Sequence, residues 1–328
     1  MKILYGLLGF VLLAGSAFSN FTPCSSRTIE EGTITNLYDA FGRDGSLQKD
    51  FGFSCILRHR GKTVLFDAGG NADIFKHNIE RLKINLKKVD FVVVSHGHFD
   101  HLNGIDYVLR VNPKVKIYMP YDIFWGAPVP FDATGPDSSA AAALHTTERY
   151  FDGGSTRFTI QQSGRFWGAN IEYVKTTREI LPGFTLVATN SPYMGYFSGY
   201  PNKSFVEGQF EEDEHSHYKY TNLPELSLAL NTGKGQVLIT GCSHSGVERI
   251  AEATKNATQD RIDLVYGGFH LIPFDKARIE AIAGYLKNDL GVRRVAPAHC
   301  TGHLAFGVLR ALYGEQYVYA GLGEMVRF

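Results

Sequence analysis

Hydrophobic and polar positions follow the same order of patterns twice along the chain. Short apolar runs on either side of a glycine-containing turn predict a β-hairpin over residues 54–66 and a second one over residues 228–240. Apolar residues at helical spacing follow each hairpin, namely Ile74, Phe75, Ile79 and Leu82 in the first half and Val247, Ile250 and Ala251 in the second. A short apolar strand comes next in each half, over residues 90–95 and 263–268. A helix and a last strand follow, and this strand ends at Pro120 in the first half and at Ala298-His299 in the second.

The spacing between equivalent landmarks of the two halves is nearly constant. Cys242 lies 175 positions after Asp67, and Asp263 lies 173 positions after Asp90. This internal repeat predicts an α/β (α+β) fold in which two similar β-rich halves pack sheet to sheet, with helices on the outer faces. The alternative is two α/β halves that merely use similar hairpins.

A long segment of about residues 121–223 separates the halves and is expected to be irregular, since it is rich in Gly, Pro, Ser and aromatic residues. Its rings would form a lid over an active site or a satellite core. The acidic run 211–214 is expected to be a solvated loop, although His215 and His217 beside it could reach a metal. The rings concerned are Phe124, Trp125, Phe131, Tyr150, Phe151, Phe166, Trp167, Tyr193, Tyr196, Phe197, Tyr200 and Phe205.

Composition supports a globular protein with a sizeable core. The chain has 328 residues, of which 44% are hydrophobic and 20% charged, enough for one large or two small domains. Lys plus Arg equals Asp plus Glu at 33 each, so no net field favours nucleic acid or an anionic membrane. We therefore expect a small-molecule substrate that is recognised locally.

The N-terminus has the pattern of an export signal. Lys2 precedes an apolar run from Ile3 to Ala14, and Ala17-Phe18-Ser19 is a small-x-small cleavage site before Asn20. We expect a signal peptide over residues 1–19, a mature domain over residues 20–328 and a periplasmic or secreted location. An uncleaved anchor is the alternative, but the run is shorter than the roughly 20 residues that span a bilayer.

Four cysteines, Cys24, Cys55, Cys242 and Cys300, leave one disulfide to consider in an exported chain. That disulfide would join Cys24 to Cys55. The alternative is that Cys55 is a small buried residue of a strand.

Metal-binding residues are concentrated in Ser95-His96-Gly97-His98-Phe99-Asp100-His101, directly after an apolar strand. Alternate side chains of a near-extended loop point the same way, so His96 and His98 can bind one cation while Asp100 and His101 turn toward a second. A chance cluster of histidines in a polar loop is the alternative. Four ligand-type side chains within six positions favour metal binding.

The repeat predicts that equivalent strand ends meet at one edge of the molecule. Candidate site residues that are distant in sequence should therefore meet there. They are Asp67, the His96 loop, Cys242, His244, His270 and His299.

The motif His96-x-His98-x-Asp100-His101, preceded by Phe66-Asp67-Ala68-Gly69, resembles the metallo-β-lactamase superfamily. Three further blocks are similar to the branch that contains the dihydropterin-ribofuranosyl-aminobenzene phosphate synthases. They are residues 241–246 (GCSHSG), 267–271 (GGFHL) and 299–302 (HCTG).

This resemblance implies a four-layer αββα sandwich with two divalent metal ions, usually zinc. His96 and His98 would hold the first metal, and Asp100, His101 and His299 the second, with Asp67 orienting the loop. In place of the bridging Asp of most members, either Cys242 or His244 would bind metal, or Cys242 would be structural. At the position of a further family histidine, the best candidate is Glu225.

The expected function is an exported metal-dependent hydrolase that cleaves a phosphoester, lactone or related bond in a small substrate. Asp100 is expected to be essential to catalysis, and His270 or His244 would protonate the departing oxygen. For His270 the roles of metal ligand and core residue stay open. Iron or manganese could replace zinc. The alternatives are a synthase of the dihydropterin type and a metal-binding protein without turnover.

Overall fold

The computed structural model describes residues 31–122, 129–132, 143–145, 149, 157–160, 165–166, 168–191 and 223–328. Within these ranges no helix has the length and apolar character needed to span a membrane. The expected signal peptide, Cys24, His215 and His217 lie outside the described residues. The predicted disulfide therefore stays a prediction, although Cys55 is buried in a strand as its alternative requires.

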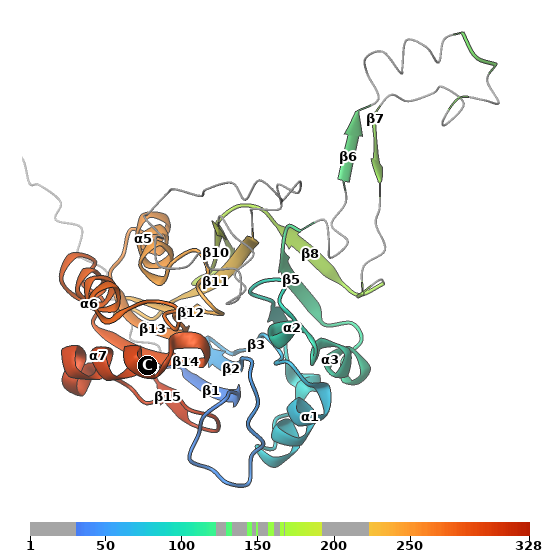
Figure 1. Ribbon diagram of the computed structural model, residues 1–328. Coiled ribbons are helices and arrows are strands. Elements are labelled where there is room, and N and C mark those ends of the chain that lie inside the picture. Colours follow the sequence, from blue (N-terminus) through green and yellow to red (C-terminus); the bar gives the residue numbers. More distant parts are fainter. Residues whose placement is uncertain are drawn as a thin grey trace, which may run out of the picture.

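Two large sheets form the centre of the molecule (Figure 1). The first has seven strands in the order β15-β1-β2-β3-β4-β5-β8. Its strands are β1 Thr33–Tyr38, β2 Ser54–His59, β3 Lys62–Phe66, β4 Phe91–Val93, β5 Lys116–Pro120, β8 Ile171–Val174 and β15 Met325–Arg327. The second has six in the order β14-β13-β12-β11-β10-β9. Its strands are β9 Arg178–Leu181, β10 Phe184–Ser191, β11 Leu223–Asn231, β12 Gln236–Thr240, β13 Ile262–Gly268 and β14 Arg294–Ala298.

The pairing of these strands confirms the internal repeat. The β2–β3 hairpin is antiparallel and is followed by the parallel pairs β3–β4 and β4–β5. The β11–β12 hairpin is likewise antiparallel, and the parallel pairs β12–β13 and β13–β14 follow it. Because the parallel strands end at the same edge of each sheet, the loops that follow them gather there.

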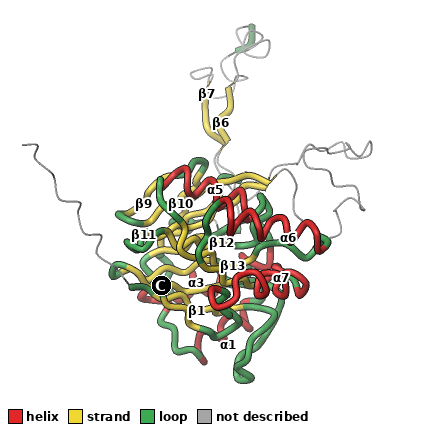
Figure 2. The backbone as a smooth tube through the Cα atoms, turned by 90° about the vertical axis from the view of Figure 1, so that its left-hand side faces the viewer, coloured by secondary structure: helices red, strands yellow, loops and turns green. Residues whose placement is uncertain are grey.

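Helices cover the outer faces of both sheets (Figures 1 and 2). On the first sheet α1 begins after Asn71, whose side-chain oxygen accepts hydrogen bonds from two backbone amides of the first turn. The helices of the first half are α1 Ala72–Arg81, η1 Leu86–Lys88, α2 Phe99–Leu102 and α3 Ile105–Val111. Those of the second half are α5 Val247–Thr258, α6 Lys276–Gly284, η6 Tyr285–Asp289, η7 His299–Thr301, α7 His303–Tyr313 and η8 Gly314–Gln316.

Three apolar clusters separate four layers, which confirms the expected αββα sandwich. The central cluster lies between the sheets and includes Phe53, Phe66, Leu228 and Tyr266. One outer cluster packs α1 and α3 against the first sheet, and the other packs α5, α6 and α7 against the second. Burial of these side chains, worth roughly 25 cal/mol per Å² of apolar surface, holds the sheets face to face.

The segment between the halves is more regular than its composition predicted. The expectation of an irregular 121–223 segment is wrong for residues 171–191, where β8 extends the first sheet and β9 and β10 extend the second. Their apolar faces, such as Phe184 and Leu186, pack into the central cluster. Two further strands, β6 Val129–Asp132 and β7 Arg157–Ile160, form a separate antiparallel pair.

Of the aromatic residues named as a lid or a satellite core, Phe166 is buried in the outer cluster of the first sheet, so that ring belongs to the main core of the first half. Phe131 lies in β6. The other ten rings of that set lie outside the described residues.

Candidate metal centre

The predicted metal-binding motif, residues 95–101, is called the motif loop. It begins as an extended segment and ends as a single helical turn. His96 follows β4 and is buried, and His98 has an extended backbone as the residue before α2. Asp100 and His101 lie within α2. The expectation of a near-extended loop is therefore right up to His98, and the helical turn directs the next two donors away from the first two.

Three imidazole nitrogens converge to form a first donor group of His96, His98 and His244. Nε2 of His96 lies 3.0 Å from Nδ1 of His98 and 3.2 Å from Nε2 of His244. The other ring nitrogen of His96 contacts the Ser95 hydroxyl at 2.8 Å, which fixes the ring orientation. All three rings lie at the carboxyl end of a strand, as the repeat predicted.

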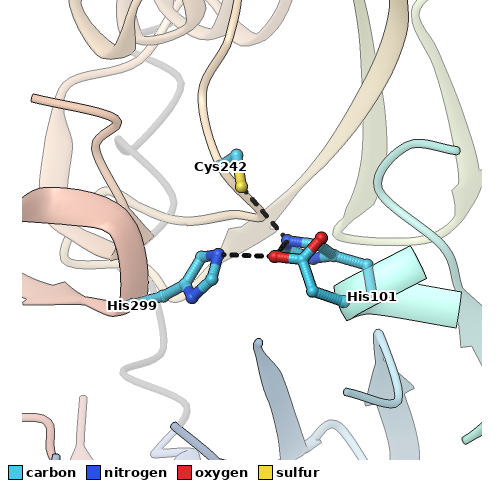
Figure 3. Close-up of side chains that lie close together, drawn as sticks. His101, Cys242 and His299 are labelled. Atoms are coloured by element: carbon cyan, nitrogen blue, oxygen red, sulfur yellow. Dashed lines mark hydrogen bonds and ion pairs between the residues drawn. The ribbon is translucent and has the colours of Figure 1, made fainter. Parts of the chain in front are cut away.

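A second donor group consists of Asp100, His101, Cys242 and His299. Nε2 of His101 lies 3.1 Å from Sγ of Cys242 and 3.5 Å from Oδ2 of Asp100, and the same carboxylate oxygen lies 3.3 Å from Nε2 of His299. Figure 3 shows Cys242 and His299 approaching the motif loop from the other half of the molecule. The two halves thus contribute to both groups.

Cys242 and His244 were expected as alternatives, but the structure brings both to the centre. Cys242 lies in the second donor group and His244 in the first. Ser243 between them has a left-handed backbone with φ of 67°, so the chain turns between the two side chains.

Asp67 orients the motif loop, as expected. One of its carboxylate oxygens accepts a hydrogen bond from the Ser95 amide at 2.7 Å. The other accepts the Ser95 hydroxyl at 2.7 Å and lies 2.6 Å from Nδ1 of His101. A carboxylate on the far nitrogen of a ligating histidine fixes its tautomer and raises its basicity.

Glu225 anchors the loop that carries His244. Its buried carboxylate accepts hydrogen bonds from the His244 amide at 2.8 Å and from the amide and hydroxyl of Ser245 at 2.7 and 2.6 Å. Glu225 belongs to none of the donor groups among the described residues. The residue proposed by position as a ligand is therefore placed to hold a ligand loop.

A third carboxylate, that of Asp39, holds the loop of His299. Asp39 follows β1 and accepts the backbone amide of His299 at 3.1 Å. Burial raises the pKa of Asp39 to about 6, although the nearby His299 and a hydrogen bond from Asn36 act in the opposite direction. Sequence analysis missed this residue, because an isolated acidic residue after a strand is too common a pattern to indicate a role.

Backbone strain is concentrated at these loops. Seven described residues other than glycine have positive φ, and four of them, Asp67, Ser243, His270 and His299, belong to the centre or adjoin its donors. Left-handed conformations cost about 1 kcal/mol or more for such residues and persist where the surroundings fix them. Their clustering indicates a functional site.

The pKa shifts of the donor side chains favour metal binding. Burial, together with neighbouring histidines, lowers the pKa of His96 and of His244 well below the usual value, so both rings are neutral and can bind metal at pH 7. Burial alone would raise the pKa of Asp100, but the adjacent histidines, His101 first among them, hold it well below its usual value. Burial raises the pKa of the Cys242 thiol, so a metal must displace its proton.

The donor chemistry fits two divalent metals. Imidazole nitrogens in the first group, and nitrogen, carboxylate oxygen and sulfur in the second, are the ligand types that bind zinc. Iron and manganese accept the nitrogen and oxygen donors as well.

Comparisons with known proteins agree with the fold described above. The family model of the metallo-beta-lactamase superfamily matches residues 48–157. A solved protein described as a metal-dependent hydrolase of the beta-lactamase superfamily aligns with 90% of this chain and 98% of its own, with a TM-score of 0.61 and 24% identity. YhfI from Bacillus subtilis, a metallo-beta-lactamase fold protein, aligns with 91% of this chain and 100% of its own, with a TM-score of 0.51 and 11% identity. This chain has the metallo-β-lactamase fold.

A curated relative also carries the expected resemblance to the synthase branch. It is the 7,8-dihydropterin-6-methyl-4-(beta-D-ribofuranosyl)-aminobenzene-5'-phosphate synthase of Methanocaldococcus jannaschii, which is 29% identical over 271 residues. The alignment covers 81% of this chain and 85% of that enzyme. The resemblance inferred from the sequence motifs is confirmed.

This metallo-β-lactamase-fold protein has a third donor group, made of Cys242, His270 and Cys300. The ring of His270 lies 4.1 Å, centroid to centroid, from that of His244, so it adjoins the first donor group. Cys300 was given no role from the sequence. Its place beside His299, directly after a buried strand, was the signal that could have indicated one.

Replacement of Glu225 by glutamine tests its anchoring role in this metallo-β-lactamase-fold protein. A glutamine amide has one acceptor oxygen, so its NH2 group would face either the His244 amide or the Ser245 donors. The His244 loop should therefore shift, and the affinity for one metal equivalent should fall about 10- to 100-fold. Competition with a chromogenic zinc chelator measures this, and E252Q, on the exposed face of α5, is the matched control. Equal zinc affinities in E225Q and E252Q would contradict the anchoring role.

Proposed function

We propose that the protein is a metal-dependent hydrolase that cleaves a phosphoester, lactone or related bond in a small substrate. One observation carries the proposal: seven donors from two chain halves form two adjoining groups at one edge of the sheets. Two such groups match the two-metal centres that hydrolases use. The resemblance to a superfamily that contains described hydrolases supports the same conclusion.

The residues that would hold the metals divide between the two donor groups. The first metal would be held by His96, His98 and His244, and the second by Asp100, His101, Cys242 and His299. We propose zinc, because sulfur and imidazole donors favour it. Bound there, the two ions would supply Lewis acidity and lower the pKa of water to near 7.

The chain's own residues position these donors and move the proton. Asp67 fixes the ring of His101, and Glu225 fixes the backbone of His244. With His244 assigned to the first metal, His270 is the histidine beside it that remains for proton transfer. We assign His270 the protonation of the departing oxygen, a role that positioned histidines commonly fill.

A synthase of the dihydropterin type is the second candidate. The 29% identity to the Methanocaldococcus jannaschii enzyme over most of both chains favours it. The N-terminal signal pattern argues against it, because an exported protein would be separated from substrates that we expect in the cytoplasm. We therefore rank export and hydrolysis first.

Replacement of Asp100 by alanine tests the hydrolase. The variant should lose most of its affinity for one metal equivalent and at least about 100-fold in kcat/KM, because its carboxylate belongs to the second donor group. The assay is a panel of chromogenic phosphomonoesters, phosphodiesters, esters and lactones, combined with elemental analysis. D289A, at an exposed acid of η6, is the control.

Zinc-loaded wild type without turnover on the whole panel would contradict the hydrolase. The two remaining candidates would then be the synthase and a metal-binding protein without turnover.

Replacement of His270 by alanine tests its proton transfer. A substrate with a poor leaving group, such as an alkoxide, needs protonation, so its kcat should fall about 10²- to 10⁴-fold. A substrate that releases nitrophenolate should lose far less, since that anion departs unprotonated. Equal losses on both substrates, measured with the metal content held constant, would remove His270 from this role.

Fractionation of the native host separates the two candidate functions. We expect the protein outside the cytoplasm, with a mature N-terminus at Asn20 when the intact mass is measured. A cytoplasmic protein with its first residues retained would reverse the ranking in favour of the synthase.

A further inference from the structure

Cys242, His270 and Cys300 form a compact donor set that the proposed hydrolysis does not require as a unit. Their Sγ and imidazole donor atoms all lie within 4.8 Å of one another, and all three residues are buried. We infer that this set is an additional, inhibitory binding position for a thiophilic metal ion such as Zn²⁺. The binding stands on the geometry alone, whereas the inhibition rests on the proposed hydrolase.

The chemistry of the set suits a soft cation. Two thiolates and one imidazole are a known zinc donor set in proteins, with a fourth position left open. Zn–S and Zn–N bonds of about 2.3 and 2.0 Å place tetrahedral donors about 3.5–3.8 Å apart. Donor atoms that all lie within 4.8 Å of one another need only a small side-chain adjustment to reach that geometry.

The three segments that carry the donors are bound to one another by hydrogen bonds. The hydroxyls of Thr240 and Ser243 both donate to the Gly268 carbonyl, at 3.1 and 2.7 Å. The Phe269 amide donates to the Thr301 hydroxyl at 3.2 Å. These bonds fix the backbone beside each donor, so the set is preformed.

Gly268 leaves the space that the sulfur of Cys300 occupies. A Cβ added at Gly268 would lie 3.0 Å from Sγ of Cys300 and 2.4 Å from the Gly241 carbonyl oxygen. The same sulfur lies 3.5 Å from the Cys242 carbonyl oxygen. Cys300 is thus directed at the Cys242 segment.

Occupation of this position would disturb the catalytic centre through two shared residues. Cys242 belongs to the second donor group as well, and His270 is the residue to which we assign proton transfer. A cation bound here would displace the thiol protons and draw Cys242 away from its partner His101. It would also occupy the His270 nitrogen, so His270 could no longer carry a proton. Excess zinc should therefore inhibit.

The test compares wild type with C300S, which removes one donor and leaves both catalytic groups complete. C55S is the matched control, because Cys55 is equally buried in β2 but belongs to none of the donor groups. Each apo protein is titrated with Zn²⁺ to count tightly bound equivalents, and with Cd²⁺ to record thiolate-to-metal absorption in the ultraviolet. We expect wild type and C55S to bind one equivalent more than C300S and to absorb more strongly.

The activity arm uses the same three proteins. At two zinc equivalents C300S should match wild type, and at higher zinc wild type and C55S should lose at least about 10-fold in rate while C300S does not. C300A replaces C300S if circular dichroism shows that the serine variant is unfolded.

Identical zinc stoichiometry and cadmium spectra in wild type and the Cys300 variants would overturn the additional position. An extra equivalent that leaves the rate unchanged would overturn the inhibition. If all three proteins lack turnover but the extra equivalent depends on Cys300, the hydrolase fails and the metal position stands.

Discussion

The candidate centre depends on the close approach of two loops that belong to different sheets. A Cβ added at Gly241 would lie 2.1 Å from the Ser95 hydroxyl oxygen, so only glycine allows the second half to come this near the motif loop. The Leu226 amide donates to the Ser95 carbonyl at 2.7 Å and fixes the same approach from β11. Nitrogens of His96 and His244 can meet at 3.2 Å because the backbones are already in contact.

Buried carboxylates keep this approach in one geometry. Each donor loop has its own anchor: Asp67 for the motif loop, Glu225 for the His244 loop and Asp39 for the His299 loop. The anchors accept backbone amides as well as side chains, which offsets the cost of burying a carboxylate and the strain of the left-handed residues nearby. The candidate cation ligands are thus held by an anchored backbone, which would limit how far a donor moves if metal binds.

Most of the fold and of the donor set could be predicted from the sequence, because the patterns that indicate them are either local or repeated in the two halves. The nearly constant offset between equivalent landmarks, Asp67 with Cys242 and Asp90 with Asp263, predicted the paired halves. The spacing from His96 to His101 predicted the motif. The division of Cys242 and His244 between two groups could not be predicted, since it depends on the turn at Ser243. The anchor Asp39, the anchoring role of Glu225 and the third donor group were missed for a related reason: their partners are distant in sequence, and no pattern specifies which strand ends will touch.

Cys242 links two sets of donors that differ in chemical character. The second group combines its sulfur with a carboxylate oxygen and two imidazoles, whereas the third combines it with another sulfur and one imidazole. The second donor group, with its carboxylate oxygen, favours hard and borderline cations. The third group, with its two sulfurs, favours softer cations. If both positions bind metal as proposed, the shared sulfur means that the metal contents of the two positions cannot vary independently. The identity and supply of metal would then regulate the proposed hydrolase without any large conformational change.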